Sequence, residues 1–191
     1  MDDSDRQALL RIAADAVLSV VSGLSPPSAP NLPGGMSDAG AFVTLHVRGQ
    51  LRGCVGSFFP RESLPQTVHH MAREACEDAR FDDRRISPTE LPEVEIEISV
   101  ISPLRRTNDP ESLRVGLDGI YIRRDGRTGC FLPQVAPEAG WDARTFLDKC
   151  CELKVGAAAD LWRDPETEVF LFTTERFEAT LGAIRAAAGH V

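Results

Sequence analysis

Apolar residues recur at helical spacing in two stretches of this chain, and a third helix is expected after Trp141-Asp142. Side chains that are apolar at every third or fourth position cover one face of a helix, so each stretch predicts a packing helix. The predicted helices cover residues 6–21, 63–79 and 145–154. Ser4 and Asp5 precede the first stretch and are typical capping residues. Cys76 lies on the apolar stripe of the second, so we expect its thiol to be buried and unreactive.

Strand patterns fall between these helices and predict two hairpins and two further strands. Arg48 and Gly49 separate the strands of the first hairpin, and the turn at residues 124–127 separates those of the second. One further strand alternates acidic and apolar residues, which is the period of a half-buried strand. The strands cover residues 41–47 with 50–59, 119–122 with 129–132, 93–101, and 169–172.

This order of elements indicates an α+β fold with mainly antiparallel strands, because hairpins replace the regular βαβ alternation. Each hairpin has one apolar face that is too small to form a core alone, so we expect both hairpins to lie in one continuous sheet. We expect a single domain of two related halves, approximately residues 1–100 and 101–191, with a proline-rich connection at 23–35.

Composition narrows the class of protein. The chain has 191 residues, 42% of them hydrophobic, and a net charge of −8, which disfavours binding to nucleic acid or an anionic membrane. No stretch approaches the ~20 apolar residues of a membrane span, and the acidic N-terminus lacks the apolar core of a signal peptide, so we expect a cytoplasmic protein.

Cysteine and histidine spacing predicts neither a disulfide framework nor a metal site. The five cysteines are odd in number and form no C-x-x-C pair, which argues against a four-thiolate zinc site. His70, Glu74 and Glu77 share one face of the second predicted helix, a spacing that suits metal ligands but is more typical of an exposed polar face. We therefore expect no metal and no cofactor.

The motif Leu51-Arg52-Gly53-Cys54-Val55-Gly56 carries the candidate chemistry. Glycines weaken a strand, so Gly53 and Gly56 indicate a bend or a place where another group approaches the backbone. Arg52 lies two residues before Cys54, on the same strand face, and a nearby cation stabilises a thiolate. Cys54 is therefore a candidate nucleophile or thiol ligand; the alternative is a cysteine packed in the core.

His46 is a candidate base for Cys54, and the hairpin register decides its position. A two-residue turn places Val43 opposite Cys54 and His46 on the other face of the sheet. A three-residue turn brings His46 to the face of the sulfur, so both arrangements stay open.

Four motifs in this order resemble the AMMECR domain family, whose prokaryotic members are also called the A component of the AmmeMemoRadiSam system. The resemblance runs from about Leu9 to Glu178. The motifs are residues 51–56, 74–81, 91–100, and 131–138 with Trp141-Asp142. The resemblance implies an α+β fold of two related halves sharing one barrel-like sheet. It also implies two partners, a Memo-like protein and a radical SAM enzyme, but no established reaction.

Two classes of function fit these residues. In the first, the chain is an enzyme or enzyme subunit acting on a small molecule, with Cys54 as nucleophile, Arg52 holding an anionic group and the amides near Gly53 and Gly56 as oxyanion donors. In the second, the chain is a non-catalytic protein-binding adaptor. Residues 51–56 are then structural, and the surface with Gln134 and Trp141 binds partner proteins.

Overall fold

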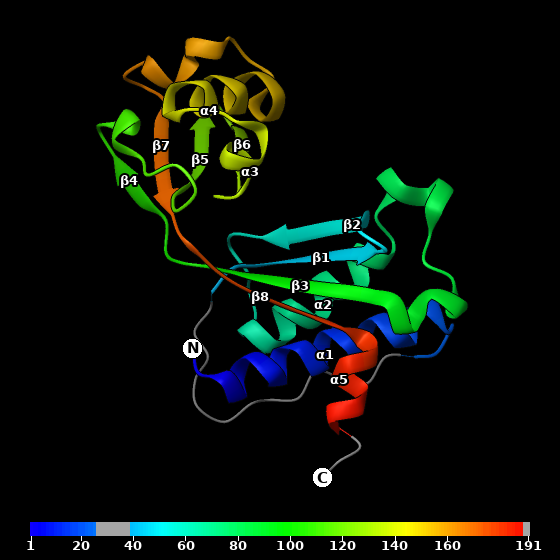
Figure 1. The fold of residues 1–191 in the computed structure, drawn as a ribbon. Coiled ribbons are helices and arrows are strands. Elements are labelled where there is room, and N and C mark those ends of the chain that lie inside the picture. The colour runs from blue at the N-terminus through cyan, green and yellow to red at the C-terminus, as the bar shows by residue number, and fades with distance from the viewer. Residues whose placement is uncertain (26–38, 189–191) are drawn as a thin grey trace. The chain divides into compact units, whose positions relative to one another are not determined.

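The computed structural model describes residues 1–25 and 39–188, and its contacts divide the chain into two compact units (Figure 1). Unit 1 comprises Met1–Ile101 and Glu175–Val191, and unit 2 comprises Ser102–Thr174. The proline-rich connection expected at residues 23–35 lies outside the described residues from residue 26 onward.

Unit 1 is built from one antiparallel sheet and the helices that cover it. Asp2 caps the first helix: its carboxylate accepts the Asp5 N–H at 2.8 Å, and the Asp5 carboxylate accepts the Asp2 N–H at 3.4 Å. The helix therefore begins earlier than the sequence predicts. The elements are α1 (Asp3–Val21), β1 (Ala41–Val47), β2 (Gln50–Ser57), α2 (Leu64–Cys76), β3 (Val94–Ile101), β8 (Thr174–Thr180) and α5 (Leu181–Ala188), with 3-10 helices η1 (Ala79–Arg84) and η2 (Pro88–Glu93).

The first sheet has the strand order β2-β1-β3-β8. Alternate side chains of β1 and β3, such as Leu45 and Ile96, are fully buried in one core with residues of α1 and α2. Figure 1 shows these two helices next to the sheet. The side chains between them in sequence, such as Thr44 and Glu97, lie on the opposite face, which we call the outer face of the first sheet.

Unit 2 has its own sheet and core. The second sheet has the order β4-β7-β5-β6, and Ile120, Phe146 and Leu147 are fully buried between it and its helices. The elements are β4 (Arg105–Thr107), β5 (Gly119–Arg124), β6 (Arg127–Phe131), α3 (Val135–Ala139), α4 (Ala143–Cys150), a π-helical turn η4 (Cys151–Val155) and β7 (Glu168–Phe172), with 3-10 helices η3 (Pro110–Ser112) and η5 (Ala159–Arg163).

The prediction of one continuous sheet is wrong, because the two hairpins lie in different four-stranded sheets. β3 and β8 complete the sheet of the first hairpin, and β7 and β4 complete that of the second. Each hairpin thus buries its apolar face in a separate core. The described strands form no closed barrel, whereas the α+β class with antiparallel sheets is confirmed.

The two units repeat one arrangement of strands. In each, a two-residue turn with positive φ joins a hairpin whose second strand is at the sheet edge and whose first strand pairs with a third antiparallel strand. A glycine followed by a cysteine stands on each edge strand, Gly53-Cys54 on β2 and Gly129-Cys130 on β6. Cys130 is thus the positional counterpart of Cys54.

The C-terminal segment of the chain belongs to unit 1. β8 and α5 were not predicted as elements, and the expected second half of the chain included them. Arg6 of α1 binds Glu175 of β8 through Nε at 2.9 Å and Nη2 at 2.7 Å, and Leu181 and Ile184 of α5 are buried in the core of unit 1. The fold of unit 1 therefore needs both ends of the described chain.

Candidate functional site

A β-bulge at Arg52 sets the position of the cysteine motif. Val47 pairs with Gln50 across the two-residue turn, but the register then shifts, with His46 opposite Leu51 and Leu45 opposite Gly53. Arg52 is the extra residue of β2, which is typical of a bulge. As a result Thr44, and not Val43, lies opposite Cys54.

The Cys54 side chain lies on the outer face of the first sheet. Its thiol is half-buried, and Thr44 Oγ1 donates a hydrogen bond to Sγ at 3.3 Å. The bulge also places His46 on this face, because His46 lies two residues from Thr44 on the same strand. The inference that a two-residue turn separates His46 from the sulfur is therefore wrong, since it assumed a regular strand.

Asp78 and Arg80 hold the backbone of Cys54 at its N–H group and at its carbonyl. The Cys54 N–H donates to Asp78 Oδ2 at 3.1 Å, and Arg80 Nη2 donates to the Cys54 carbonyl at 2.7 Å. Arg80 also binds the Asp78 carboxylate through Nε and Nη2, at 2.9 and 2.6 Å. Both residues belong to the motif at residues 74–81, but the sequence alone assigns them no role.

The charges of Asp78 and Arg80 stabilise each other. The hydrogen bond from Arg80 is the main cause that lowers the pKa of Asp78, to about 2, with further contributions from the N–H groups of Cys54 and Arg80. The pKa of Arg80 is raised mainly by the hydrogen bond to Asp78, and the charges of Asp78 and Cys54 raise it further. Arg80 is thus a cation that interacts with Cys54.

Arg52 makes a different set of contacts. Its side chain is only 13% exposed, and Nη1 donates to the Arg84 carbonyl and Nη2 to Glu90 Oε1, both at 3.1 Å. These bonds tie β2 to the segment that contains η1 and η2, and Glu90 compensates the Arg52 charge.

The two glycines of the motif allow close approach of other groups. A Cβ atom on Gly53 would overlap the carbonyl of Ala75 in α2, and one on Gly56 would overlap the ring of Phe42 in β1. Both glycines are therefore explained by packing, on opposite faces of β2. Gly129 has the same role on β6, where a Cβ would overlap Lys154 and Val155.

Two predicted binding residues, Gln134 and Trp141, lie in unit 2, whereas Arg52, Gly53, Cys54 and Gly56 share β2 in unit 1. Gln134 precedes α3, and the Trp141 ring packs on Phe131 at 5.8 Å.

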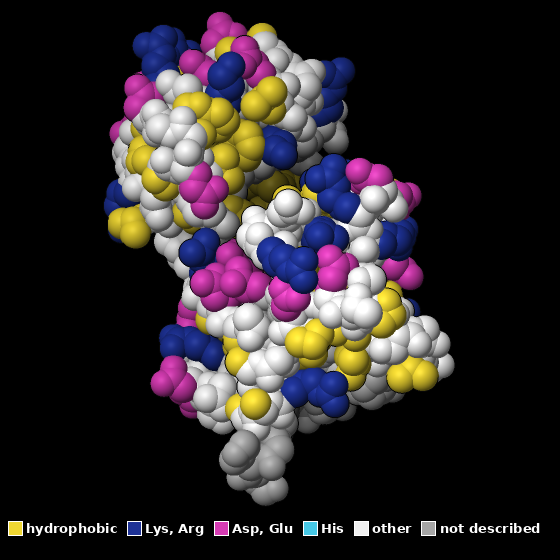
Figure 2. Space-filling model, turned by 45° about the vertical axis from the view of Figure 1, so that its right-hand side comes forward, with side chains coloured by type: hydrophobic (Ala, Val, Ile, Leu, Met, Phe, Trp, Pro, Cys, Tyr) yellow, Lys and Arg dark blue, Asp and Glu magenta, His cyan; other side chains and the backbone are white. Residues whose placement is uncertain are grey.

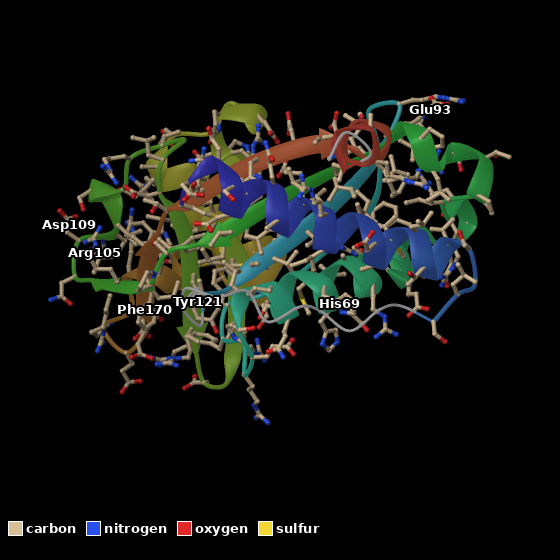
Figure 3. The ribbon with its side chains drawn as sticks, turned by 90° about the horizontal axis from the view of Figure 1, so that it is seen from below. His69, Glu93, Arg105, Asp109, Tyr121 and Phe170 are labelled. Carbon is tan, nitrogen blue, oxygen red and sulfur yellow. The ribbon has the colours of Figure 1, made fainter. Side chains whose placement is uncertain are left out.

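The second sheet carries an aromatic pair near Cys130. Tyr121 lies opposite Cys130 on one side and opposite Phe170 on the other, and the two rings meet edge to face at 6.1 Å. Figure 3 labels Tyr121 and Phe170 next to each other.

Three other cysteines have thiols that burial keeps protonated. Burial raises the pKa of Cys76 to about 12 and that of Cys151 to about 11, and it raises the pKa of Cys150 still further. Cys76 is half-buried and packs against the core of unit 1, so it is less enclosed than the sequence predicts. Within residues 1–25 and 39–188 no group of three or more His, Cys, Asp or Glu side chains is arranged to hold a metal ion.

Two further features concern the charge of the surface and the character of the helices. Basic and acidic side chains are interspersed on the face shown in Figure 2. None of the described helices combines the length and the apolar character that crossing a bilayer requires.

These features define a class of protein. It has an α+β fold with two antiparallel sheets, and a glycine-flanked cysteine lies on an edge strand. The AMMECR1 family model matches residues 10–177, so the chain belongs to the AMMECR1 family. This membership confirms the resemblance seen in the sequence motifs.

Archaeal relatives cover most of the chain. Protein NEQ441 of Nanoarchaeum equitans is 41% identical over 150 residues, which are 73% of this chain and 81% of that protein. Protein MK0488 of Methanopyrus kandleri is 36% identical over 180 residues, or 89% of this chain and 86% of that protein. The crystal structure of the uncharacterized protein PH0010 from Pyrococcus horikoshii has a TM-score of 0.84 at 30% identity and covers 93% of both chains.

Proposed function

We propose that this chain is the thiol-bearing component of a multi-component enzyme system and that Cys54 reacts with an electrophilic small molecule. The observation that carries the proposal is the geometry of Cys54. Its half-buried thiol accepts a hydrogen bond from Thr44, and its backbone N–H and carbonyl are bound by Asp78 and Arg80. A hydroxyl donor and a nearby cation are the groups that stabilise negative charge on a reacting sulfur.

Arg80 takes the electrostatic role that the sequence analysis gave to Arg52. Arg80 is 62% exposed on its side chain and contacts the Cys54 carbonyl, whereas Arg52 is bound to Glu90. An exposed guanidinium that contacts the Cys54 carbonyl can also bind an anionic group of a substrate. Arg52 then has the role of holding the bulge that orients Cys54.

The proposed partners are a Memo-like protein and a radical SAM enzyme, the two that the resemblance of the sequence motifs implies. A thiol component that lacks the complete chemistry for a reaction fits a system in which other proteins supply the remaining groups. We therefore expect the Cys54 site to change when the partners bind.

The test combines the purified chain with the Memo-like and radical SAM proteins of the same genome. Iodoacetamide alkylation of Cys54 is followed by peptide mapping with and without the partners. We expect the partners to change the alkylation rate of Cys54 severalfold and to leave that of Cys76, which is the internal control, unchanged. The absence of any complex, or no native alkylation of Cys54, would contradict the proposal.

The second candidate function is a non-catalytic adaptor, and the packing of the two glycines favours it. Gly53 and Gly56 are required by Ala75 and Phe42 alone, so the motif has a structural explanation without any reaction. For an adaptor, the Cys54→Ala variant keeps every activity of the assembled system. For the thiol component, the same variant binds the partners but is inactive.

A further inference from the structure

Polar side chains form a row across the outer face of the first sheet. Cys54 on β2 lies directly opposite Thr44 on β1, and Thr44 lies directly opposite Glu97 on β3. Side chains that face each other across antiparallel strands point to the same face, with Cβ atoms about 4.5–5.5 Å apart. A thiol, a hydroxyl and a carboxylate therefore stand in line across three strands.

This row is buried, although its members are polar. Thr44 is 9% exposed and Glu97 is 7% exposed. Burying such groups costs free energy unless they are paired, and here Thr44 binds Cys54 Sγ while Arg176 of β8 contacts Glu97 Oε2 at 3.4 Å. Apolar side chains would pack at these positions at lower cost, so the polar row calls for a reason other than stability.

Ser99 adds a hydroxyl to the same face. It lies two residues after Glu97 on β3, is 2% exposed, and its Oγ has no hydrogen-bond partner within the part of the chain that the structure describes. A buried hydroxyl without a partner costs free energy, and a polar group of a bound ligand would satisfy it.

We infer that Glu97 is the proton acceptor for Cys54 and that the Thr44 hydroxyl relays the proton. The inference rests on the proposed function, since a base is needed only if the thiol reacts. The Cys54 S–H proton passes to Thr44 Oγ1 while the Thr44 hydroxyl proton passes to the Glu97 carboxylate. The sulfur then forms a bond to an electrophilic carbon, and the leaving group departs with the bonding electron pair.

The Thr44–Cys54 hydrogen bond is compatible with the states before and after the proton transfer. Thr44 donates to the sulfur in the structure, which is the arrangement after the proton has moved. A hydroxyl has one donor and two acceptor positions, and its hydrogen rotates. Before the transfer, Thr44 Oγ1 therefore accepts a hydrogen bond from the Cys54 S–H group.

Other charged groups border the row without lying between its members. Thr44 occupies the position between Cys54 and Glu97 in both strand registers. Arg176 and Glu178 alternate along β8 with Phe177 and Ala179, which pack into the core, so they share the outer face with Glu97. The bordering groups are Asp78, which caps η1, Arg80 of η1, Arg52 of β2, His46 of β1, Glu95 of β3, and Arg176 and Glu178 of β8.

The test is the pH profile of Cys54 alkylation by iodoacetamide in the folded protein, measured site by site. A thiol that loses its proton only to water reacts ten times more slowly for each unit by which the pH falls below the pKa of the thiol. A thiol with an internal acceptor reacts at a pH-independent rate wherever that acceptor is ionised. We expect such a plateau in the wild type and in Thr44→Ser, and its loss in Glu97→Gln and Thr44→Val.

Glu95→Gln is the matched control, because Glu95 lies on the same strand and face in the next row, opposite His46. It should keep the plateau. A Glu97→Gln profile that is parallel to the wild type, or faster, would overturn the relay, because removing a neighbouring negative charge by itself favours the thiolate. The plateau of the wild type can be measured even if a variant fails to fold. Absence of any native alkylation of Cys54 defeats the proposed function as well, whereas alkylation without a plateau defeats only the relay.

Discussion

Asp78 and Arg80 fix the Cys54 backbone, so at the scale of single residues the thiol has a defined position on β2. The Asp78 side chain is 7% exposed and accepts hydrogen bonds from the Cys54 N–H and from Arg80. A buried carboxylate of this kind stabilises the native state only while it is ionised and paired.

Asp78→Asn should lower the free energy of unfolding by about 1–3 kcal/mol, because it removes the charge from hydrogen bonds to a buried carboxylate. Urea denaturation followed by circular dichroism measures this loss. Asp83→Asn is the control, since Asp83 is 70% exposed and pairs with its neighbour Arg84, and it should change nothing measurable. Equal effects of the two variants would show that Asp78 does not anchor β2.

The stabilisation by Asp78 should disappear in acid. Its pKa is lowered from 3.8 to about 2 in the folded protein, so the contribution is complete above about pH 4 and is lost as the pH falls through 2. The difference in unfolding free energy between the wild type and Asp78→Asn should therefore shrink across this window. A difference that stays constant down to pH 2 would mean that Asp78 has an ordinary pKa in the folded state.

At the scale of elements, α2 and β2 are joined through a glycine contact. Gly53→Ala should destabilise the protein by about 2 kcal/mol or more, because the new Cβ would overlap the Ala75 carbonyl and push the strand from the helix. Gly49→Ala is the control, because a Cβ atom on Gly49 would meet open space. Its cost of about 1 kcal/mol comes from the positive φ of 73°, which alanine adopts with strain. Thermal unfolding ranks the two, and an equal cost would contradict the close contact.

Periodicity was sufficient to predict most elements of the two hairpins and the long helices, because each has a regular apolar face. It could not predict the bulge at Arg52, since a bulge depends on how β1 and β2 pair and not on the pattern within either strand. Because of this single extra residue, Cys54 pairs with Thr44 and not with Val43. The site residues Thr44, Glu97 and Asp78 were missed for the same reason: only pairing and folding bring them to the thiol.

At the scale of the whole molecule, the chain returns to unit 1 after building unit 2. The sequence did not predict β8, because its apolar residues are few and its edge position leaves alternate side chains exposed. Nor could it predict separate sheets, since the partners of a hairpin are chosen by contacts distant in sequence.

Deleting residues 175–191 should therefore unfold unit 1 and spare unit 2. The deletion removes β8 and the buried side chains of Leu181 and Ile184, each of which contributes about 2–5 kcal/mol. Hydrogen exchange resolved by residue should show lost protection in β1 and β3 and retained protection in β5 and β7. Loss of protection in both units would contradict two separate cores.

The most direct test of the central claim is the order in which the cysteines of the folded protein react with iodoacetamide. Peptide mapping after brief exposure at neutral pH should find Cys54 modified before Cys76, Cys150 and Cys151, whose pKa values are raised by burial. Modification of Cys54 only on unfolding, together with Cys150, would show that residues 51–56 are a packing motif and that Cys54 is not a reactive site.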